Sequence, residues 1–304
     1  MNKKKSNRAK KLSPKPKHEV TVSKSQGLLA FVLENISGES RNNLKSYLRR
    51  GQITVNGAMI KQFDFLLSPG DIVRIEHTSQ RPKTSGPNLE IIYEDEYLLA
   101  INKPAGVLSV ASDQERKRTA YVLANNYVQT KNPRARVHVV HRLDQETSGV
   151  LLFAKDEETR NILQKKWNQL VKKRGYYAIT IGIPQPTEGR LEDYLFTNAT
   201  SLMYVGKKSP QSVLAITNYK VKQIKENFAL LDIDIETGKK NQIRVQLKNI
   251  GCPIVGDKKY ESKLDPLKRL GLHAYELRLR HPRNEQDLKL SAPLPREFKQ
   301  FIAT

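Results

Sequence analysis

The sequence has little cysteine and no long apolar run. Cys252 is the only cysteine among the 304 residues, so an intramolecular disulfide and a cysteine-based zinc site are both excluded. The longest apolar runs, such as residues 28–33 and 150–154, are far too short to span a bilayer. The basic N-terminus is not followed by an apolar stretch, which argues against a secretory signal. We therefore expect a soluble protein in the reducing cytoplasm.

The sequence motifs of several common enzyme sites are also missing. There is no Walker-type phosphate loop, no G-x-G-x-x-G dinucleotide fingerprint and no G-x-S-x-G nucleophile elbow. An enzyme with this sequence would therefore have to work with its own side chains rather than with a nucleotide cofactor.

Acidic residues are few in comparison with basic ones. The chain has 53 lysines and arginines against 31 aspartates and glutamates, which gives a formal net charge of +22. Lysine and arginine gain free energy when they release counterions from phosphates, so this excess favours a polyanionic partner. Nucleic acid is the partner that we expect. An anionic membrane surface is the alternative, because a basic tail alone would suit either.

Composition predicts two segments without a packed core. Residues 1–26 combine many lysines with the single acid Glu19 and few apolar side chains, so they cannot repay the entropy of ordering. We expect this basic tail to be disordered, and to act as an RNA tether or only as a solubilising segment. Residues 78–88 are rich in Ser, Thr, Pro and Gly, which is typical of a linker.

Residues 27–77, between the tail and the linker, have the pattern of a small helix-plus-sheet module. Apolar residues at helical spacing in residues 28–36 predict a first helix, Ser40 can cap a second, and Gly51 is placed to end it. Strand patterns follow at residues 53–55 and 72–75, the first of them before an Asn-Gly hairpin turn.

The second predicted helix carries Arg41, Lys45 and Arg49 four residues apart, on one face. The motifs around it resemble the S-four-type RNA-binding domain, which is named after a ribosomal protein. This resemblance implies that the Arg41/Lys45/Arg49 face contacts RNA phosphates, and the alternative is an ordinary solvated helix face. The matching motifs are the Ser40-Arg41 helix start, the Arg50–Gly57 turn and Pro69–Val73.

Residues 89–304 form a second predicted domain. Many short strand patterns are interspersed with helical patterns such as residues 157–166 and 242–250. Strands and helices do not alternate regularly, so we predict an α+β domain with a mixed, mainly antiparallel sheet rather than a doubly wound one.

The densest polar cluster of this domain lies at residues 141–148, between the apolar strand patterns 137–140 and 149–154. A loop held between two buried strands is a rigid place to mount reactive groups. Arg142 stands two residues before Asp144, and a nearby guanidinium favours the ionised carboxylate. Asp144 could then act as a nucleophile or stabilise positive charge.

The residues alone leave three other interpretations of this cluster open. Asp144 could start a simple Asx-type turn. His138, His141 and Asp144 could form a metal site, although a spacing of three on a strand points the two histidines to opposite faces. Ser148, His141 and Asp144 could form a hydrolase triad, although nothing in the sequence marks Ser148 as a strained nucleophile.

The stretch from His141 to Lys155, with Asp144 followed by Thr147-Ser148-Gly149, resembles the signature of the RluA-type RNA pseudouridine synthases. Further motifs of that family follow in the family's order between about residues 90 and 295. These are Asn102–Val107, Tyr176–Ala178, Thr237–Val245, Gly251–Tyr260, Leu272–Ala274 and His281-Pro282.

The resemblance implies a reaction, the isomerisation of a uridine in folded RNA from a nitrogen-linked to a carbon-linked nucleoside, without cofactor or metal. Asp144 matches the family's essential aspartate. Arg142 matches an arginine that helps to displace the target base, and Tyr176 matches a tyrosine that packs against it. Arg244 matches the arginine that pairs with the aspartate. The alternatives are core packing for Tyr176 and a plain surface charge for Arg244.

The chain departs from the family pattern near Arg244. Lys239 replaces an arginine, and Asn241 and Gln246 replace two histidines. Lys239 keeps a charge that can contact RNA but loses the bidentate geometry of arginine. Asn241 and Gln246 can hydrogen-bond but do not titrate. We expect these changes to affect substrate choice more than chemistry.

We thus expect an RNA pseudouridine synthase that acts on structured RNA. Large-subunit ribosomal RNA is the expected substrate, because related enzymes with this N-terminal module mostly act there, and transfer RNA is the alternative. A rival interpretation is a ribosome-assembly factor that kept the fold and lost turnover. We expect neither a membrane nor an obligate protein partner.

Overall fold

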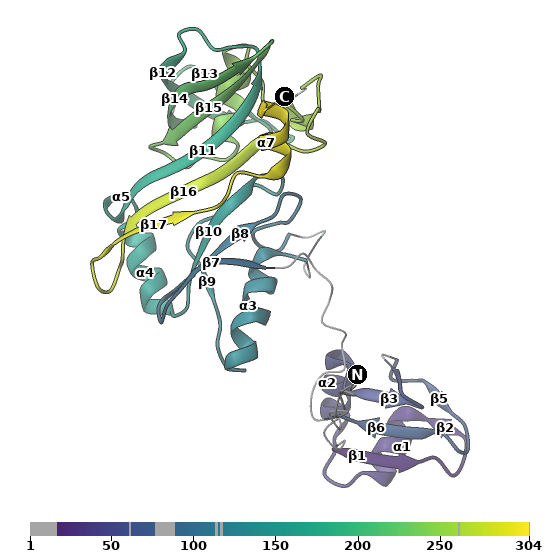
Figure 1. The fold of residues 1–304 in the computed structure, drawn as a ribbon. Coiled ribbons are helices and arrows are strands. Elements are labelled where there is room, and N and C mark those ends of the chain that lie inside the picture. Colours follow the sequence, from purple (N-terminus) through teal and green to yellow (C-terminus); the bar gives the residue numbers. More distant parts are fainter. Residues whose placement is uncertain are drawn as a thin grey trace, which may run out of the picture. The chain divides into compact units, whose positions relative to one another are not determined.

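The computed structural model describes residues 17–60, 62–76, 89–112, 115, 118–260 and 262–303. The chain divides into two compact units, Met1–Ser85 and Gly86–Thr304, which we call the N-terminal and C-terminal units (Figure 1). Within the described residues, no helix is both long and apolar enough to cross a membrane. The linker expected at residues 78–88 lies outside the described residues.

The N-terminal unit combines two helices with a four-stranded antiparallel sheet of order β1-β6-β3-β4 and a separate pair, β2 with β5. Buried apolar side chains from both helices and from β3 and β6 form one core. The elements are β1 (His18–Thr21), β2 (Gln26–Gly27), α1 (Leu28–Asn35), α2 (Arg41–Arg50), β3 (Ile53–Val55), β4 (Ala58–Met59), β5 (Leu66–Leu67) and β6 (Ile72–Ile75).

Local signals place α2 and the turn after β3 where the sequence predicts them. The Ser40 hydroxyl accepts a hydrogen bond from the Asn43 N–H at 3.1 Å, and Gly51 ends the helix in the left-handed conformation with φ 66°. Asn56 and Gly57 have φ angles of 50° and 82°, as a tight turn between paired strands requires. Arg41 and Lys45 are exposed on α2, and the side chain of Arg49 lies outside the described residues.

The tail predicted for residues 1–26 is too long at its C-terminal end. His18–Thr21 form β1, which pairs antiparallel with β6, and Val22 is buried in the core. The side chain of Glu19 forms an ion pair with Arg74 across this pair of strands. Val20 and Val22 have the two-residue period of a strand, which the composition of a lysine-rich segment hid. Residues 1–16 lie outside the described residues.

The C-terminal unit is built on one 11-stranded sheet with the path β13-β12-β14-β15-β11-β16-β10-β8-β7, and with β17 on β16 and β9 on β10 (Figure 1). All of its pairs are antiparallel except β10 with β16. The predicted α+β class with a mainly antiparallel sheet is thus confirmed. The strands are β7 (Glu90–Glu94), β8 (Leu98–Lys103), β9 (His138–Val139), β10 (Ser148–Ala154), β11 (Val171–Ile181), β12 (Glu188–Thr197), β13 (Met203–Gly206), β14 (Val213–Lys225), β15 (Phe228–Ile235), β16 (Leu272–Arg280) and β17 (Asp287–Ser291).

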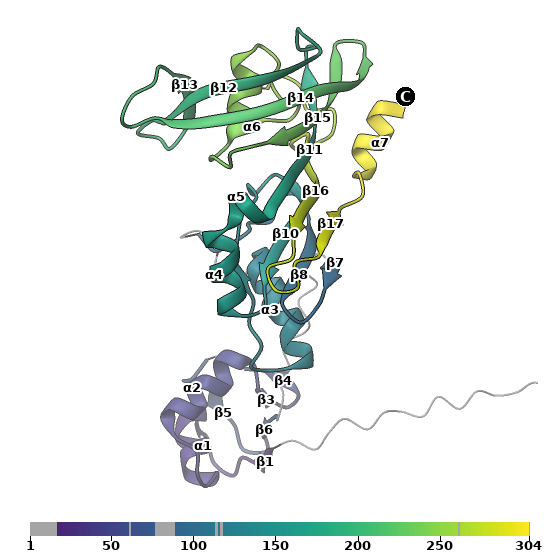
Figure 2. The ribbon, with the colours of Figure 1, turned by 90° about the vertical axis from the view of Figure 1, so that its left-hand side faces the viewer.

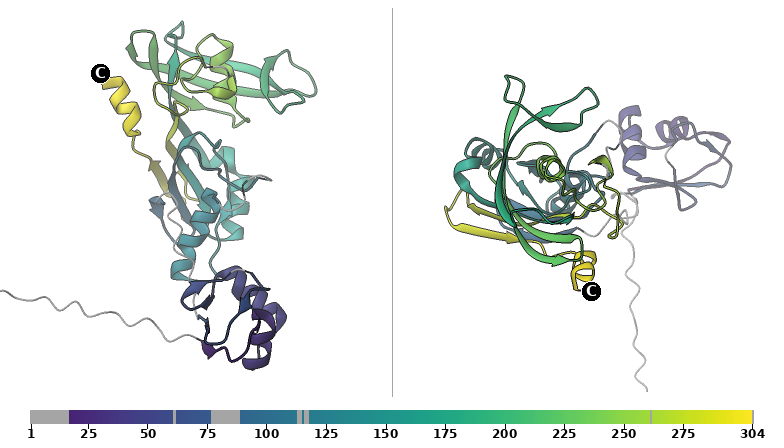
Figure 3. Two further views of the ribbon diagram at one scale, coloured as in Figure 1. Left: turned by 90° about the vertical axis from the view of Figure 1, so that its right-hand side faces the viewer. Right: turned by 90° about the horizontal axis from the view of Figure 1, so that it is seen from above.

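Helices cover both faces of this sheet at β8 and β10. Leu151 and Phe153 of β10 pack with α3 in one core cluster, whereas Val150 and Leu152 pack with Leu163 of α4 in another. Successive side chains of a strand point to opposite faces, so a strand covered on both sides is apolar throughout, as β10 is. Further along the sheet, α6 lies against β12, β13 and β14 (Figure 2, Figure 3). The helices are α3 (Ala120–Lys131), α4 (Glu157–Lys165), α5 (Trp167–Leu170), α6 (Gln242–Asn249) and α7 (Arg296–Ala303), with a 3-10 turn at Lys258–Tyr260.

A close backbone contact joins the two parts of the sheet where β10 begins. Ser148 and Gly149 lie opposite His273 and Ala274 in the parallel pair of β10 and β16. Gly149 has φ +116°, and a Cβ there would overlap the backbone of Ala274, 2.6 Å from its carbonyl carbon. Only glycine fits this position, so the start of β10 is fixed against β16.

We therefore predict that Gly149→Ala lowers the free energy of unfolding by about 3 kcal/mol or more, since it adds both backbone strain and a clash with backbone atoms. Gly251→Ala is the matched control. Gly251 also has a positive φ, +77°, but a Cβ there would meet nothing within 4 Å, so the cost should be about 1 kcal/mol. Urea unfolding measures both, and equal losses in the two variants would contradict the close contact.

Candidate active site

Residues 140–147 connect β9 to β10 and carry Asp144. The hydroxyl of Ser109, which is buried, donates to the Leu143 carbonyl at 2.7 Å and accepts from the Leu143 N–H at 3.0 Å. The Thr147 N–H donates to the Asp144 carbonyl at 3.1 Å, which closes a backbone turn. Asp144 is thus held by hydrogen bonds on both sides, and its side chain, 33% exposed, is left for other partners.

Lys103, at the end of β8, forms a hydrogen bond to the same connection. Its side chain is fully buried, and its ammonium donates to the carbonyls of Pro104, Val107 and Gln145 at 2.7 to 3.0 Å. Burial lowers the pKa of Lys103 to about 7, although Glu146 and Asp144 act in the opposite direction. This ammonium ties the turn after β8 to the residue that follows Asp144.

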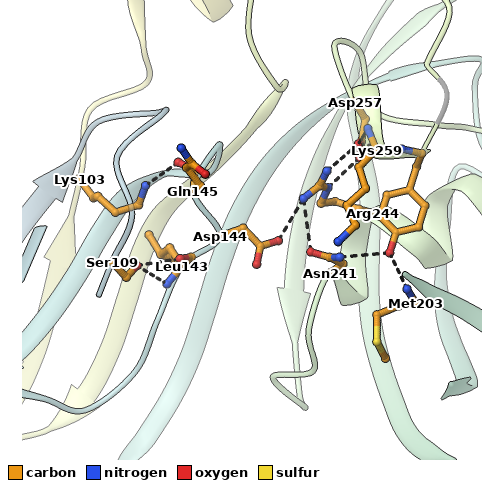
Figure 4. A network of polar contacts seen from close by, with 11 residues as sticks. Lys103, Ser109, Leu143, Asp144, Gln145, Met203, Asn241, Arg244, Asp257 and Lys259 are labelled. Carbon is orange, nitrogen blue, oxygen red and sulfur yellow. Dashed lines mark hydrogen bonds and ion pairs between the residues drawn. The ribbon is translucent and has the colours of Figure 1, made fainter. Parts of the chain in front are cut away.

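The cation that meets Asp144 is Arg244 of α6, at 3.4 Å between Nη1 and Oδ2 (Figure 4). Sequence proximity suggested Arg142 for this role, but the Arg142 side chain is exposed and forms no ion pair with Asp144. Residues 141–144 form neither strand nor helix and lead into a turn, so a separation of two residues along the chain did not place the two side chains together.

Arg244 is itself held by Asp257. Its Nε and Nη2 donate to the two Asp257 oxygens at 2.8 and 2.7 Å, while Nη1 is left for Asp144. The side chains of Arg244 and Asp257 are 8% and 1% exposed, which excludes the alternative of a plain surface charge for Arg244. Burial works against the charged guanidinium, but Asp257 and then Asp144 raise the pKa of Arg244 above its ordinary value.

Asn241, just before α6, lies next to Asp144 in a left-handed conformation with φ 53°. Of its two amide orientations, the one that pairs donors with acceptors directs Nδ2 to Asp144 Oδ2 at 2.8 Å. The Asn241 oxygen then accepts from the Tyr260 hydroxyl at 3.2 Å and from Lys259 Nζ at 3.1 Å. Asp144 therefore has an amide and a guanidinium as its neighbours on the α6 side.

Tyr176, on β11, lines a cavity with Arg142, Asp144 and Arg244, which we call the inner cavity. Burial raises the pKa of Tyr176 to about 12, so its hydroxyl stays protonated at neutral pH. The ring also packs at the edge of two core clusters. Tyr176 thus supplies an apolar wall and a hydroxyl beside the Asp144 carboxylate.

The other two departures from the family pattern lie in different surroundings. Gln246 is fully buried, and its amide joins α6 to Asp193 at 2.8 Å and to Thr217 at 2.7 Å. Lys239 is exposed at the rim of the inner cavity. Gln246 therefore belongs to the scaffold, whereas Lys239 is open to a ligand.

The alternative constellations of the 141–148 cluster do not assemble. The Asp144 side chain turns to Arg244 and not back to its own turn. His141 Nε2 accepts from the Leu152 N–H at 2.9 Å, away from Asp144. The Ser148 hydroxyl meets His273 Nδ1 at 2.8 Å instead of His141, so the hydrolase triad is absent. No group of three or more potential metal ligands occurs within the described ranges.

A second cavity, of about 490 Å³, is also lined by Asp144 and Arg244 and has more basic than acidic side chains. None of the lysines that line it has a carboxylate partner within the part of the chain that the structure describes. Such a concentration of ammonium groups without carboxylate partners suits a phosphate backbone. These lysines are Lys240, Lys258, Lys259 and Lys268.

Several residues of this site were not assigned a role from the sequence. Asp257 and Lys103 lay within quoted motifs, but a spacing of 13 residues from Arg244 to Asp257 gives no sign of a bidentate pair. Ser109 and Lys259 carried no signal that we could have used. Buried partners of a reactive group come from other elements, and a single sequence does not show which elements meet.

Comparisons with known proteins agree in pointing to one family. Residues 97–249 match the family model described as RNA pseudouridylate synthase. The chain is 30% identical over 281 residues to "Uncharacterized RNA pseudouridine synthase YhcT" of Bacillus subtilis (strain 168), covering 91% of this chain and 92% of that protein. It is also 30% identical over 298 residues to "Ribosomal large subunit pseudouridine synthase C" of Haemophilus ducreyi, covering 91% of each.

A solved structure shares the fold. The chain matches "Human RNA Pseudouridylate Synthase Domain Containing 4" with a TM-score of 0.57 and 29% identity, covering 69% of this chain and 90% of that one. The family-model match spans Asp144, Tyr176 and Arg244, so the site described above lies within the shared region.

We predict that Asp257→Asn lowers the free energy of unfolding by about 3 kcal/mol, because it leaves the buried Arg244 guanidinium with one weak partner. Glu188→Gln is the control, since Glu188 pairs with Lys220 in solvent and its loss should leave stability unchanged. Thermal and urea unfolding measure both. A neutral effect of Asp257→Asn would show that Arg244 does not depend on this carboxylate.

Proposed function

Because this chain belongs to the RNA pseudouridylate synthase family, we propose that it converts specific uridines of large-subunit ribosomal RNA to pseudouridine in the cytoplasm, with Asp144 as the catalytic carboxylate. The observation that carries this proposal is the placement of Asp144. It is the only acidic side chain among the described residues that line the inner cavity, and Arg244 and Asn241 hold it there.

The reaction breaks the bond between uracil N1 and ribose C1′ and forms a bond from uracil C5 to C1′. A proton leaves C5 and N1 gains one, so the substrate gains and loses no atoms overall. In this scheme Asp144 either attacks the ribose or the uracil ring, or stabilises the positive charge that develops when the base departs. Arg244 and Asn241 orient its carboxylate and leave one face open to the cavity.

Tyr176 and Arg142 are assigned to the target base. A protonated Tyr176, with its ring against the inner cavity, offers the uracil an apolar surface and a hydrogen-bond donor. Arg142 is exposed at the same cavity and can take the place of the extruded base in the RNA stack. Extrusion costs a few kcal/mol, which such contacts must offset.

One feature supports ribosomal RNA in particular, and two support RNA in general. A relative that is 30% identical over most of the chain is named as a ribosomal large subunit pseudouridine synthase. The N-terminal unit displays Arg41 and Lys45 on the exposed side of α2, and we assign this S-four-like unit to RNA binding. Lys239 and the lysines of the second cavity add positive charge around Asp144.

We predict that the native protein forms pseudouridine on an unmodified bacterial large-subunit ribosomal RNA transcript and that Asp144→Asn forms none. A carbodiimide-dependent primer-extension stop locates the product. Glu146→Gln is the matched control, because Glu146 is an exposed carboxylate two residues away that does not line the inner cavity. Product from Asp144→Asn would refute the role of Asp144, and no product from the native protein on ribosomal or transfer RNA would refute the activity.

For the N-terminal unit we predict that the double variant Arg41→Gln/Lys45→Gln binds this RNA less tightly. The slope of log affinity against log salt should become shallower by roughly 1.4, about 0.7 for each lost phosphate contact on single strands. Lys24→Gln is the control, since Glu34 already neutralises Lys24 at 3.6 Å. Filter binding over a series of salt concentrations measures the slope, and an unchanged slope would remove the α2 face from the interface.

A further inference from the structure

Trp167 is the only tryptophan of the chain, and it lies outside the apolar cores. Trp167 begins the short helix α5. Leu170, at the end of this helix, packs against a core cluster, as does Val171 after it. The indole of Trp167 instead lies on the ring of His141, with centroids 5.2 Å apart and planes inclined by 35°. A large apolar side chain placed this way is available to a ligand.

The space beside Trp167 is a cavity of about 640 Å³, which we call the outer cavity. Arg142, Asp144 and Tyr176 line both the inner and the outer cavity, whereas Trp167 lines the outer but not the inner one. The outer cavity therefore opens onto the reaction centre. Trp167 lies beyond the place assigned to the target uracil.

The charges of the outer cavity suit a nucleic-acid strand. Arg174, Lys239 and Lys240 line it, and Asp144 is its only acidic side chain within the described residues. An aromatic surface together with several cations is the combination that binds single-stranded nucleic acid, with the base on the ring and the phosphate on the cations. A purely apolar ligand would bring no negative charge to these cations.

His141 holds the indole in place as an uncharged ring. Its Nε2 accepts the Leu152 N–H at 2.9 Å, and burial, with a smaller effect of Arg174, lowers the pKa of His141 to about 4. The histidine thus remains neutral and oriented at physiological pH. A side chain that is already ordered loses little entropy when a second ring stacks on it.

We propose that the indole of Trp167 is the stacking platform for the RNA base next to the target uridine. This inference rests on the proposed function for the identity of the ligand. When the target uridine is extruded, both of its neighbours in the strand lose a stacking partner. Arg142 can fill the vacated place for one neighbour, and Trp167 supplies a new surface for the other in the outer cavity. Trp167 is thereby a binding residue and makes no contact with the reacting atoms.

The single tryptophan allows a direct test that does not require turnover. An unmodified large-subunit ribosomal RNA transcript is titrated into the Asp144→Asn protein at low salt, and indole emission is followed beside filter binding. We expect emission to fall along the same curve as complex formation. Trp167→Phe with added free N-acetyltryptophanamide corrects for light absorbed by the RNA. Unchanged emission in the complex would overturn the proposal.

Inorganic polyphosphate separates stacking from charge. It carries the charge of an RNA backbone but no bases, so it should occupy the basic rim and leave the indole emission unchanged. Emission that falls equally with polyphosphate would mean that the change reports charge or a shift of α5 and would overturn the stacking assignment.

Kinetics of two variants give a second test. Trp167→Leu removes the aromatic surface and should raise KM for the RNA about fivefold to a hundredfold, while kcat changes much less. Trp167→Phe should restore most of the affinity, because phenylalanine also stacks. Both variants are compared at matched fractions folded, from their melting curves. A KM of Trp167→Leu equal to the native value, or no rescue by phenylalanine, would refute the platform.

The proposed activity and the proposed role of Trp167 can be refuted independently of each other. Pseudouridine formed by the native protein without an emission change in the complex would leave the activity standing and remove Trp167. An emission change that follows RNA binding, in a protein that forms no pseudouridine, would support the platform and refute the activity.

Discussion

The ion pair between Arg244 and Asp257 is the interaction on which the rest of the site depends. A guanidinium that is 8% exposed is costly to bury unless a carboxylate meets it, and Asp257, 1% exposed, does so through two hydrogen bonds. Because Asp257 neutralises Arg244, Asp144 makes only one long contact of 3.4 Å with the same guanidinium. One carboxylate is thereby used for structure, and the other remains available for reaction.

The separate roles of Asp257 and Asp144 depend on the register of the sheet. Arg244 comes from α6, which packs on β12, β13 and β14, whereas Asp144 precedes β10 in the other part of the sheet. The two parts meet where β10 and β16 run parallel, at the close contact of Gly149 with Ala274. A shift of this contact would move Asp144 relative to Arg244, so a glycine without a direct chemical role helps to set the distance between two charged groups.

The sequence predicted those parts of the fold whose signals are local. The apolar run of β10, the Ser40 cap and the turn after β3 need no knowledge of distant residues, and all three occur as expected. β12 and β14 were not predicted, because one face of each is open to solvent and their polar residues obscure the pattern.

The side chains that surround Asp144 in the candidate site were harder still to predict from local signals in the sequence. Asp144 and Arg244 were paired through a family resemblance across 100 residues of sequence, which no spacing rule could have done. Reasoning from spacing alone chose Arg142, and the structure replaces it with Arg244. Asp257 and Asn241 fill out the surroundings of Arg244 and Asp144 through side-chain geometry that depends on how α6 packs.

The two histidines that the family pattern would place near Arg244 are replaced for different physical reasons. Gln246 is enclosed between α6, β12 and β14, where its amide satisfies several buried groups at once. Asn241 instead stands between the Asp144 carboxylate and the Lys259 ammonium, donating to one and accepting from the other. A histidine in that position could gain or lose a proton in the physiological range and would change its donors with pH. An amide keeps one donor and one acceptor at every pH, so the link between Asp144 and Lys259 does not depend on a proton at residue 241.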